Sequence, residues 1–304
     1  MQLKSKNVIA VVGPTAVGKT SCGIRLAEHF QTEILSADSR QCYRELNIGV
    51  ARPSDEELQQ VPHHFIASHS IHEDLTAADY ETYALNSSAQ LFQEKNQLIL
   101  VGGTGLYIKA FASGLDPIPE VAPAIRQQVI GLYAEKGIHG LQAELIRLDP
   151  EFAQEGEMQN PQRMMRALEV MITTGMSIVA YRSGSDKTRP FGIRWVGLEL
   201  PREELIRRID ERVETMMQNG LLQEVQSLYA HRTLNALQTV GYRELFDHLS
   251  GRCSLDEAVE RIKISTRQYA KRQMTWFRKV PDMHWFHPSD ETGILKFLEG
   301  VNPK

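Results

Sequence analysis

Short hydrophobic runs alternate with amphipathic, helix-forming stretches through the first hundred residues. The runs Val8–Val12, Thr32–Ala37 and Gln97–Val101 have the length and composition of buried strands. Between them, helices are expected at Gly18–Phe30 and, after an approximate capping box, at Thr76–Lys95. This alternation predicts an α/β fold with a parallel sheet flanked by helices.

The pattern changes in the middle of the chain. Three prolines within Asp116–Pro123 indicate a hinge or a domain boundary, and no strand pattern follows until Arg194–Leu200. The residues between these two segments have a helical pattern. We therefore predict one core domain, residues 1–118 and 192–304, with an all-helical insertion at residues 119–191.

A long helix is expected near the end of the chain, from a capping box at Ser254 to Arg278 or Lys279. Within it Ile262, Tyr269 and Trp276 recur every seven residues, which predicts a stripe that faces the core. The stretch from residue 261 to 279 has seven basic residues and no acidic one: Arg261, Lys263, Arg267, Lys271, Arg272, Arg278 and Lys279. Because the chain as a whole has a formal net charge of -4, a face of one sign favours contact with a polyanion over a merely solvated surface.

Composition excludes several other classes of protein. The three cysteines lie far apart without a C-x-x-C pair, so neither a disulfide framework nor a zinc site is expected. His63, His64, His69 and His72 lack the helical spacing of metal ligands. The first apolar run is too short to span a membrane and leads directly into a glycine-rich loop. We expect a reduced, cytoplasmic protein without a membrane partner.

A phosphate-binding loop follows the first predicted strand and precedes the first predicted helix. The segment fits G-x-x-x-x-G-K-[ST], and its residues are Gly13, Pro14, Thr15, Ala16, Val17, Gly18, Lys19 and Thr20. In such a loop the backbone N–H groups and the lysine bind phosphate oxygens, and the hydroxyl of Thr20 is the expected ligand of Mg²⁺. The sequence therefore predicts a P-loop NTPase-like sheet.

The acid that an ordinary P-loop enzyme uses to hold Mg²⁺ is missing from its usual place. The strand Gln97–Val101 ends in Gly102-Gly103-Thr104 instead of an aspartate, so the loop could hold a diphosphate without splitting a nucleoside triphosphate. Asp38, at the end of the second predicted strand, is the available carboxylate. From the residues alone it could bind Mg²⁺, cap a short helix expected to follow it, or act as a general base.

Taken together, the motifs resemble the tRNA dimethylallyltransferase family, the IPP transferases, in its bacterial type. They occur in family order over nearly the whole chain, which makes the match far more specific than the phosphate loop alone. The matching segments are Gly13–Thr20, Asp38–Tyr43, Pro62–His64, Val101–Tyr107, Asn160–Val170, Val240–Glu244 and Ser265–Arg278.

This resemblance implies transfer of a dimethylallyl group from dimethylallyl diphosphate to the exocyclic N6 amine of adenosine 37 in a tRNA anticodon loop, with release of pyrophosphate. It implies that Asp38 accepts the proton of the amine, that Thr104 hydrogen-bonds the base or the reacting group, and that Arg212 grips the diphosphate. It places contact with the tRNA anticodon stem-loop on Asp38, Ser39, Arg40, Gln41, Thr104, Arg126, Gln162, Arg163, Arg166, Gln238, Arg243, Lys271, Arg272 and Arg278. We expect a monomer.

Two other functions compete with this interpretation. A P-loop kinase of a nucleotide or small metabolite would also have the loop and the helix after it. The absence of an acid after Gln97–Val101 and the presence of the basic helix favour the transferase over the kinase. A non-catalytic RNA-binding protein would not need an intact Lys19, Thr20 and Asp38.

Overall fold

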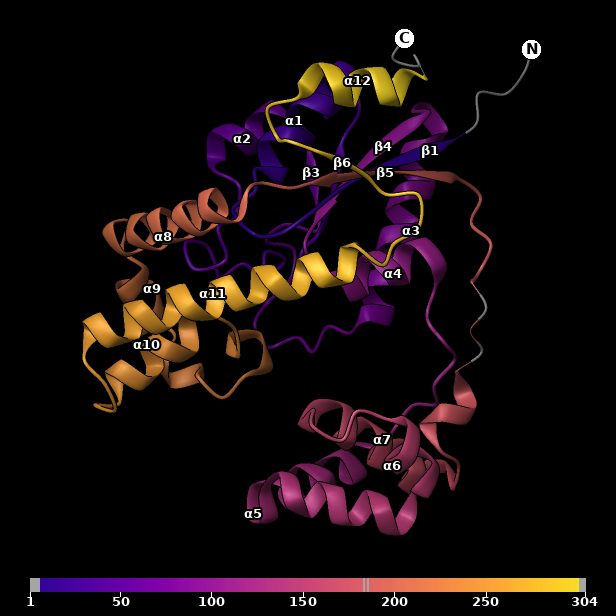
Figure 1. Ribbon diagram of the computed structural model, residues 1–304, viewed down its shortest axis with the longest axis vertical. Coiled ribbons are helices and arrows are strands. Elements are labelled where there is room, and N and C mark those ends of the chain that lie inside the picture. Colours follow the sequence, from indigo (N-terminus) through magenta and orange to yellow (C-terminus); the bar gives the residue numbers. More distant parts are fainter. Residues whose placement is uncertain (1–5, 183, 185, 301–304) are drawn as a thin grey trace. The chain divides into compact units, whose positions relative to one another are not determined.

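The computed structural model describes residues 6–182, 184 and 186–300. In these residues six parallel strands form one sheet in the order β3-β2-β4-β1-β5-β6 (Figure 1). The strands are β1 (Asn7–Val12), β2 (Ile34–Ala37), β3 (His63–His64), β4 (Gln97–Gly102), β5 (Gly192–Leu198) and β6 (His284–Phe286). The four predicted strands are all confirmed. The sequence analysis did not find the edge strands β3 and β6, which are too short to produce a periodic pattern.

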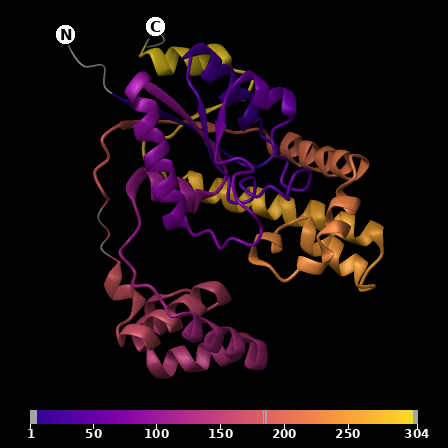
Figure 2. The same cartoon turned by 180° about the vertical axis from the view of Figure 1, so that it is seen from behind.

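Helices cover both faces of the sheet. As a result, every residue of β1 after Asn7 is buried. Val8, Ala10 and Val12 pack into one cluster with α3 (Ala77–Glu94) and α4 (Gly105–Ser113) (Figure 2). Ile9 and Val11 pack into a second cluster on the opposite face, with α1 (Lys19–His29) and α12 (Glu291–Glu299). This two-sided burial explains why the strand is a continuous apolar run.

A group of C-terminal helices completes the core unit. It comprises α8 (Arg202–Gln218), α9 (Leu221–Ser227), α10 (Tyr242–Leu249) and α11 (Leu255–Phe277), together with the one-turn segments η2 (Tyr229–His231) and η3 (Asn235–Leu237). The predicted capping box at Ser254 is present, and α11 lies between α8 and α10 (Figure 1). A short helix, α2 (Asp55–Gln60), lies between β2 and β3 in the chain.

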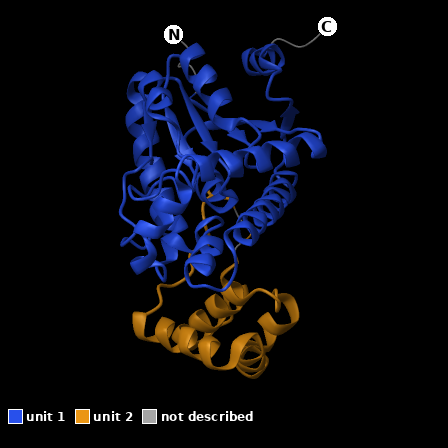
Figure 3. Cartoon of the chain, turned by 90° about the vertical axis from the view of Figure 1, so that its left-hand side faces the viewer, with its two compact units in different colours: residues 1–113, 188–304 blue, residues 114–187 orange. Residues whose placement is uncertain are grey.

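The helical insertion forms a compact unit of its own, residues 114–187, and residues 1–113 and 188–304 form the other unit (Figure 3). Its helices are α5 (Pro123–Leu148), α6 (Pro150–Glu155), α7 (Pro161–Thr174) and η1 (Ile178–Tyr181). A separate apolar cluster that includes Leu141, Met164 and Leu168 holds them together. The predicted fold class, a P-loop NTPase-like parallel sheet with an all-helical insertion, is confirmed.

One prediction for α11 is wrong. Ile262 is buried, but Tyr269 is only half-buried and Trp276 is 37% exposed, with its indole over Gly105. An ideal helix drifts about 20° for each seven residues, so a heptad stripe rotates away from the core over two repeats. The buried side of α11 instead runs through Ala258, Ile262, Ala270, Gln273 and Phe277.

No helix among the described residues combines the length and the apolar character that crossing a membrane requires.

Candidate functional site

The phosphate loop joins β1 to α1 with positive φ angles at Gly13, Ala16 and Gly18. Gly18 caps α1 at a φ of 102°, in the left-handed region, and Gly13 has a φ of 149°. A Cβ on Gly13 would lie 2.5 Å from the carbonyl oxygen of Leu198 in β5. The first N–H groups of α1 have no capping side chain, which leaves them available to an anion.

Lys19 lies at the start of α1, inside the cavity above the loop. Its Nζ donates a hydrogen bond to the carbonyl oxygen of Pro14 at 2.7 Å. Burial, and then the neighbouring Arg212, lower the pKa of Lys19 to about 7, although the carboxylate of Asp38 acts in the opposite direction. An anion bound here would restore the positive charge of this ammonium group.

Arg212 reaches the same cavity from α8. Its Nη1 donates a hydrogen bond to Oγ1 of Thr15, in the phosphate loop, at 3.3 Å. Burial lowers the pKa of the guanidinium, and Asp38 and Glu57 oppose that shift. The structure therefore brings the predicted diphosphate-binding residues and Arg212 together, although nearly two hundred residues separate them in sequence.

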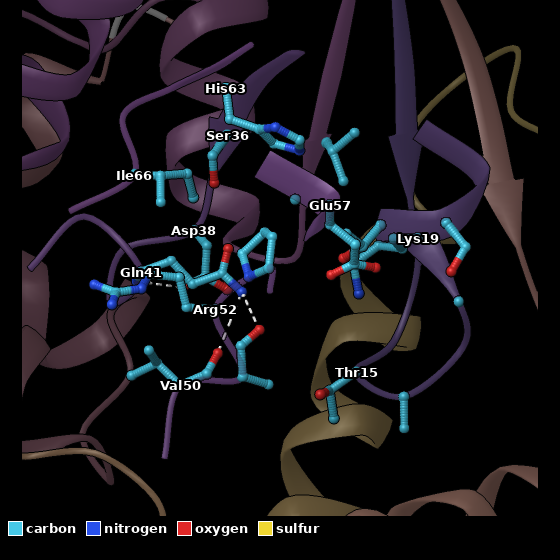
Figure 4. A pocket seen from close by; sticks show the side chains of 18 of the residues that line it. Thr15, Lys19, Ser36, Asp38, Gln41, Val50, Arg52, Glu57, His63 and Ile66 are labelled. Carbon is cyan, nitrogen blue, oxygen red and sulfur yellow. Dashed lines mark hydrogen bonds between the residues drawn. The ribbon is translucent and has the colours of Figure 1, made fainter. Parts of the chain in front are cut away.

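Asp38 lies directly after β2, on the wall of the cavity opposite Lys19 and Thr15 (Figure 4). Its Oδ1 accepts hydrogen bonds from the backbone N–H groups of Arg40, at 2.9 Å, and Gln41, at 3.2 Å. The short helix expected after Asp38 is not present: residues 39–42 form a turn, and Oδ1 of Asp38 caps this turn instead. This arrangement is compatible with the other two roles, because one carboxylate oxygen is sufficient for capping.

Thr104 connects the turn after β4 to the turn after β2. Its Oγ1 accepts a hydrogen bond from the backbone N–H of Ser39 at 3.0 Å, and its own N–H donates to the carbonyl of Ala37 at 3.2 Å. Tyr269 of α11 lies near the Thr104 side chain, and burial raises the pKa of this tyrosine to about 12. Thr104 and Asp38 thus lie on adjoining turns at the carboxyl edge of the sheet, where parallel α/β proteins bind ligands.

Two cavities meet at these residues. The first, of about 420 Å³, lies above the phosphate loop and is lined by Lys19, Thr20 and Gln41. The second, of about 340 Å³, is lined by Arg40, Gln238, Arg243 and Arg272. Both are lined by Thr15, Asp38, Val50, Ala51, Arg212 and Tyr269. We call the first the phosphate cavity and the second the arginine cavity.

A third cavity adjoins the arginine cavity. It has a volume of about 540 Å³ and shares Gln238 and Arg243 with the arginine cavity. Its further basic residues are Arg232, Arg252 and Arg261. Glu244 and Asp247 also line it, and Asp247 forms ion pairs with Arg252, at 2.7 Å, and Arg261, at 3.9 Å. The three adjoining cavities therefore form a path, lined by arginines and by acids, from the phosphate cavity past Asp38 to α10 and α11.

The residues predicted to contact RNA fall into four groups. Those on the walls of the first two cavities are Asp38, Ser39, Arg40, Gln41, Gln238, Arg243 and Arg272. Lys271 and Arg278 are exposed at the end of α11, and Arg278 lies 3.9 Å from Glu199. Arg126, Gln162, Arg163 and Arg166 belong to the insertion, where the first three are exposed and Arg166 pairs with Glu169. Thr104 is not among the residues that line the first two cavities, and the structure instead bonds it to Ser39, which lines the arginine cavity.

Two of the seven basic residues of the stretch from residue 261 to 279, Lys263 and Arg267, form close ion pairs with carboxylates. Lys263 forms ion pairs with Glu214, at 2.6 Å, and Glu260, at 2.7 Å. Arg267 forms a bidentate pair with Asp210 of α8. These pairs fasten α11 to its neighbours, so the predicted polyanion face narrows to the end of the helix.

The sequence analysis missed two functional side chains, Glu224 and Gln273. Glu224 of α9 accepts hydrogen bonds from the backbone N–H groups of three successive residues, Asn47, Ile48 and Gly49, and from the hydroxyl of Tyr242. It thereby anchors the segment whose next residues, Val50 and Ala51, line both cavities and accept hydrogen bonds from Gln41 (Figure 4). No local pattern marks such a residue, because its partners are distant in sequence.

Gln273 is almost fully buried, at 6% exposure, on the inner side of α11. Its Oε1 accepts a hydrogen bond from the backbone N–H of Thr15 at 2.8 Å, and its Nε2 donates to the carbonyl of Gly103 at 2.9 Å. The sequence analysis included it only within a motif that suggested surface contact.

Known proteins resemble this chain along its whole length. The family model described as IPP transferase matches residues 41–280. A tRNA dimethylallyltransferase 1 of Bacteroides fragilis is 43% identical over 297 residues, which cover 98% of this chain and 99% of that protein. A tRNA dimethylallyltransferase of Flavobacterium johnsoniae is 44% identical over 300 residues, which cover 96% of this chain and 97% of that protein.

Solved structures agree with the sequence comparisons. The crystal structure of a full-length tRNA isopentenylpyrophosphate transferase from Bacillus halodurans matches this chain with a TM-score of 0.73 and 33% identity. The match covers 97% of this chain and 96% of that protein chain. The structure of a eukaryotic dimethylallyltransferase acting on tRNA matches with a TM-score of 0.81 and 25% identity. This match covers 99% of this chain and 81% of that protein chain. The chain belongs to the IPP transferase family.

Proposed function

We propose that this chain transfers a dimethylallyl group from dimethylallyl diphosphate to the N6 amine of adenosine 37 in the anticodon loop of tRNA. The observation that carries the proposal is the meeting of the phosphate cavity and the arginine cavity at Asp38. One cavity suits a diphosphate and the other suits the backbone of a nucleic acid. A carboxylate where the two meet is placed to serve the reaction between their occupants.

On the donor side, the phosphate loop, Lys19 and Arg212 bind the diphosphate. As the carbon–oxygen bond to the prenyl group breaks, negative charge grows on the leaving pyrophosphate, and these fixed donors stabilise it. The hydroxyl of Thr20 and the carboxylate of Asp38 line the same cavity, a set of oxygen donors that suits Mg²⁺ together with phosphate oxygens. Thr20 would hold the ion, which when bound adds positive charge next to the leaving group.

No group of three or more histidine, cysteine, aspartate or glutamate residues that could hold a metal ion occurs in the described part of the chain. The protein side chains alone therefore offer too few ligands for tight metal binding. We expect Mg²⁺ to bind together with the diphosphate.

On the acceptor side, Asp38 accepts the N6 proton of adenine as the carbon–nitrogen bond forms. The lone pair of this amine is delocalised into the ring, so removing its proton in the transition state makes it a better nucleophile. Thr104, which is held by hydrogen bonds to Ser39 and Ala37, hydrogen-bonds the base or the reacting group. The adenosine must leave the stack of the loop to enter, at a cost of about a few kcal/mol that phosphate contacts offset.

The direct test is to incubate the chain with an anticodon stem-loop that carries adenosine 37, dimethylallyl diphosphate and Mg²⁺, and to analyse the nucleosides by mass spectrometry. The expected product is N6-dimethylallyladenosine, with one pyrophosphate released for each transfer. A stem-loop with guanosine at position 37 is the matched control and should remain unmodified. Absence of product, together with ADP formation from ATP and a small-molecule acceptor, would favour a kinase instead.

A further inference from the structure

Gln273 joins two loops that would hold different substrates. Its carbonyl oxygen accepts from Thr15, in the phosphate loop, and its NH₂ group donates to Gly103, the residue before Thr104. Thr15 also accepts a hydrogen bond from Arg212 through its hydroxyl. A single buried amide therefore links the phosphate loop and the Gly103–Thr104 turn, through hydrogen bonds of 2.8 and 2.9 Å.

The packing around this amide leaves it little freedom. A Cβ added to Gly103 would lie 2.2 Å from Nε2 of Gln273, which is closer than van der Waals contact allows. The backbone N–H of Thr15 and the carbonyl of Gly103 differ in polarity, so the amide is fixed in one orientation. On either side of Gln273 along α11, Tyr269 lines both cavities and Trp276 covers Gly105.

We propose that Gln273 is a positioning residue that sets the separation between the phosphate loop and the Gly103–Thr104 turn, and hence between the prenyl donor and the adenine amine. This inference rests on the proposed function. Bond formation between two bound reactants requires them to lie about 3–3.5 Å apart, and a misplacement of about 1 Å can cost roughly a hundredfold in rate. An amide that spans the two loops, and that also lines the phosphate cavity, controls this distance by holding the two loops in place.

The first experiment compares Gln273→Met with Gln268→Met. Methionine at 273 keeps the length of the side chain and loses both hydrogen bonds, whereas Gln268 is exposed on the same helix and is the matched control. We expect kcat of the Gln273 variant to fall by about a hundredfold. The Kd of dimethylallyl diphosphate alone, and that of the stem-loop alone, should each change by less than about threefold, since each loop remains able to bind its ligand.

A second pair of variants tests the linkage itself. In Gly103→Ala the new methyl group displaces the Gln273 amide, so kcat should fall as it does in Gln273→Met. In Gln273→Ala the space is vacant, so adding Gly103→Ala should cause little further loss. The double variant is therefore expected to match Gln273→Ala, a non-additive result that independent sites would not give.

Three outcomes would overturn the inference. The first is an unchanged kcat in Gln273→Met, and the second is a similar loss of affinity for both ligands in that variant together with a lowered melting temperature. The third is that the effects of Gly103→Ala and Gln273→Ala on kcat multiply in the double variant. The wild-type chain is assayed first. If it makes no prenylated nucleoside, the proposed function has failed; if it does and the Gln273 variants keep its rate, only the positioning role has failed.

Discussion

The phosphate cavity and the arginine cavity are built in different ways. The phosphate cavity takes its main donors from one continuous loop, in which backbone N–H groups are held by glycine geometry and by the start of α1. The arginine cavity takes its cations from long side chains on separate segments: Arg40, Arg243 and Arg272. A rigid local motif suits a small ligand of fixed shape. Long cationic side chains suit an extended polyanion that varies in conformation.

The comparison predicts that variants will separate into those that affect one substrate and those that affect the reaction. The largest effect is expected for Asp38→Asn, because Asp38 lies where the cavities meet. Asparagine keeps an oxygen to accept the N–H groups of Arg40 and Gln41, but it cannot accept the amine proton. Turnover should fall by about a hundredfold or more, as for loss of a general base. Single-turnover kinetics would measure this, and both Kd values should stay near those of the wild type; unchanged turnover would remove Asp38 from the mechanism.

Lys19→Met should weaken only the donor side. Losing a charged hydrogen-bond donor to a diphosphate costs about 1.5–3 kcal/mol, which corresponds to roughly ten- to a hundredfold in Kd. Isothermal titration with dimethylallyl diphosphate and Mg²⁺ measures the loss. An equal loss of stem-loop affinity would show that the two cavities are not independent.

The pH dependence of donor binding should also be specific to the phosphate cavity. The pKa of Lys19 is lowered to about 7 in the free site, and a bound diphosphate favours the charged form, so binding takes up a proton above that pH. Affinity is therefore full below pH 7 and falls as pH rises, by about fivefold between pH 7 and 8. In Lys19→Met this dependence should disappear; if it persists, another group causes it.

The smallest effect is expected at the arginine cavity. Arg272→Ala should weaken stem-loop binding by about threefold and reduce the slope of log Kd against log salt by about one. Lys263→Met removes the same charge from the same helix, but at a position already paired with Glu214 and Glu260. It is the matched control and should leave the slope unchanged. Equal slopes for both variants would mean that α11 acts only through its total charge.

The phosphate loop, Asp38 and the four long strands could be predicted from sequence because each depends on neighbouring residues. Gln273 could not, since its role exists only because α11 passes beneath two loops that are about 170 and 260 residues away in the chain. The ion pairs of α11 could not be predicted for a related reason. The sequence shows which residues of the helix are basic, but not which acids of α8 lie opposite them. The heptad stripe failed at Trp276, where the slow rotation of the helix turns its face away from the core.

Residues 47–49, which precede the Val50–Ala51 wall of both cavities, are hydrogen-bonded to the carboxylate of Glu224 in α9, and the same carboxylate accepts a hydrogen bond from Tyr242 in α10. The amide protons of residues 47–49 can exchange with solvent only when the attachment to Glu224 opens. Deuterium uptake at these three positions would therefore follow the opening of helices that lie almost two hundred residues further along the chain. A label in the first fifth of the protein would report on the integrity of its last third.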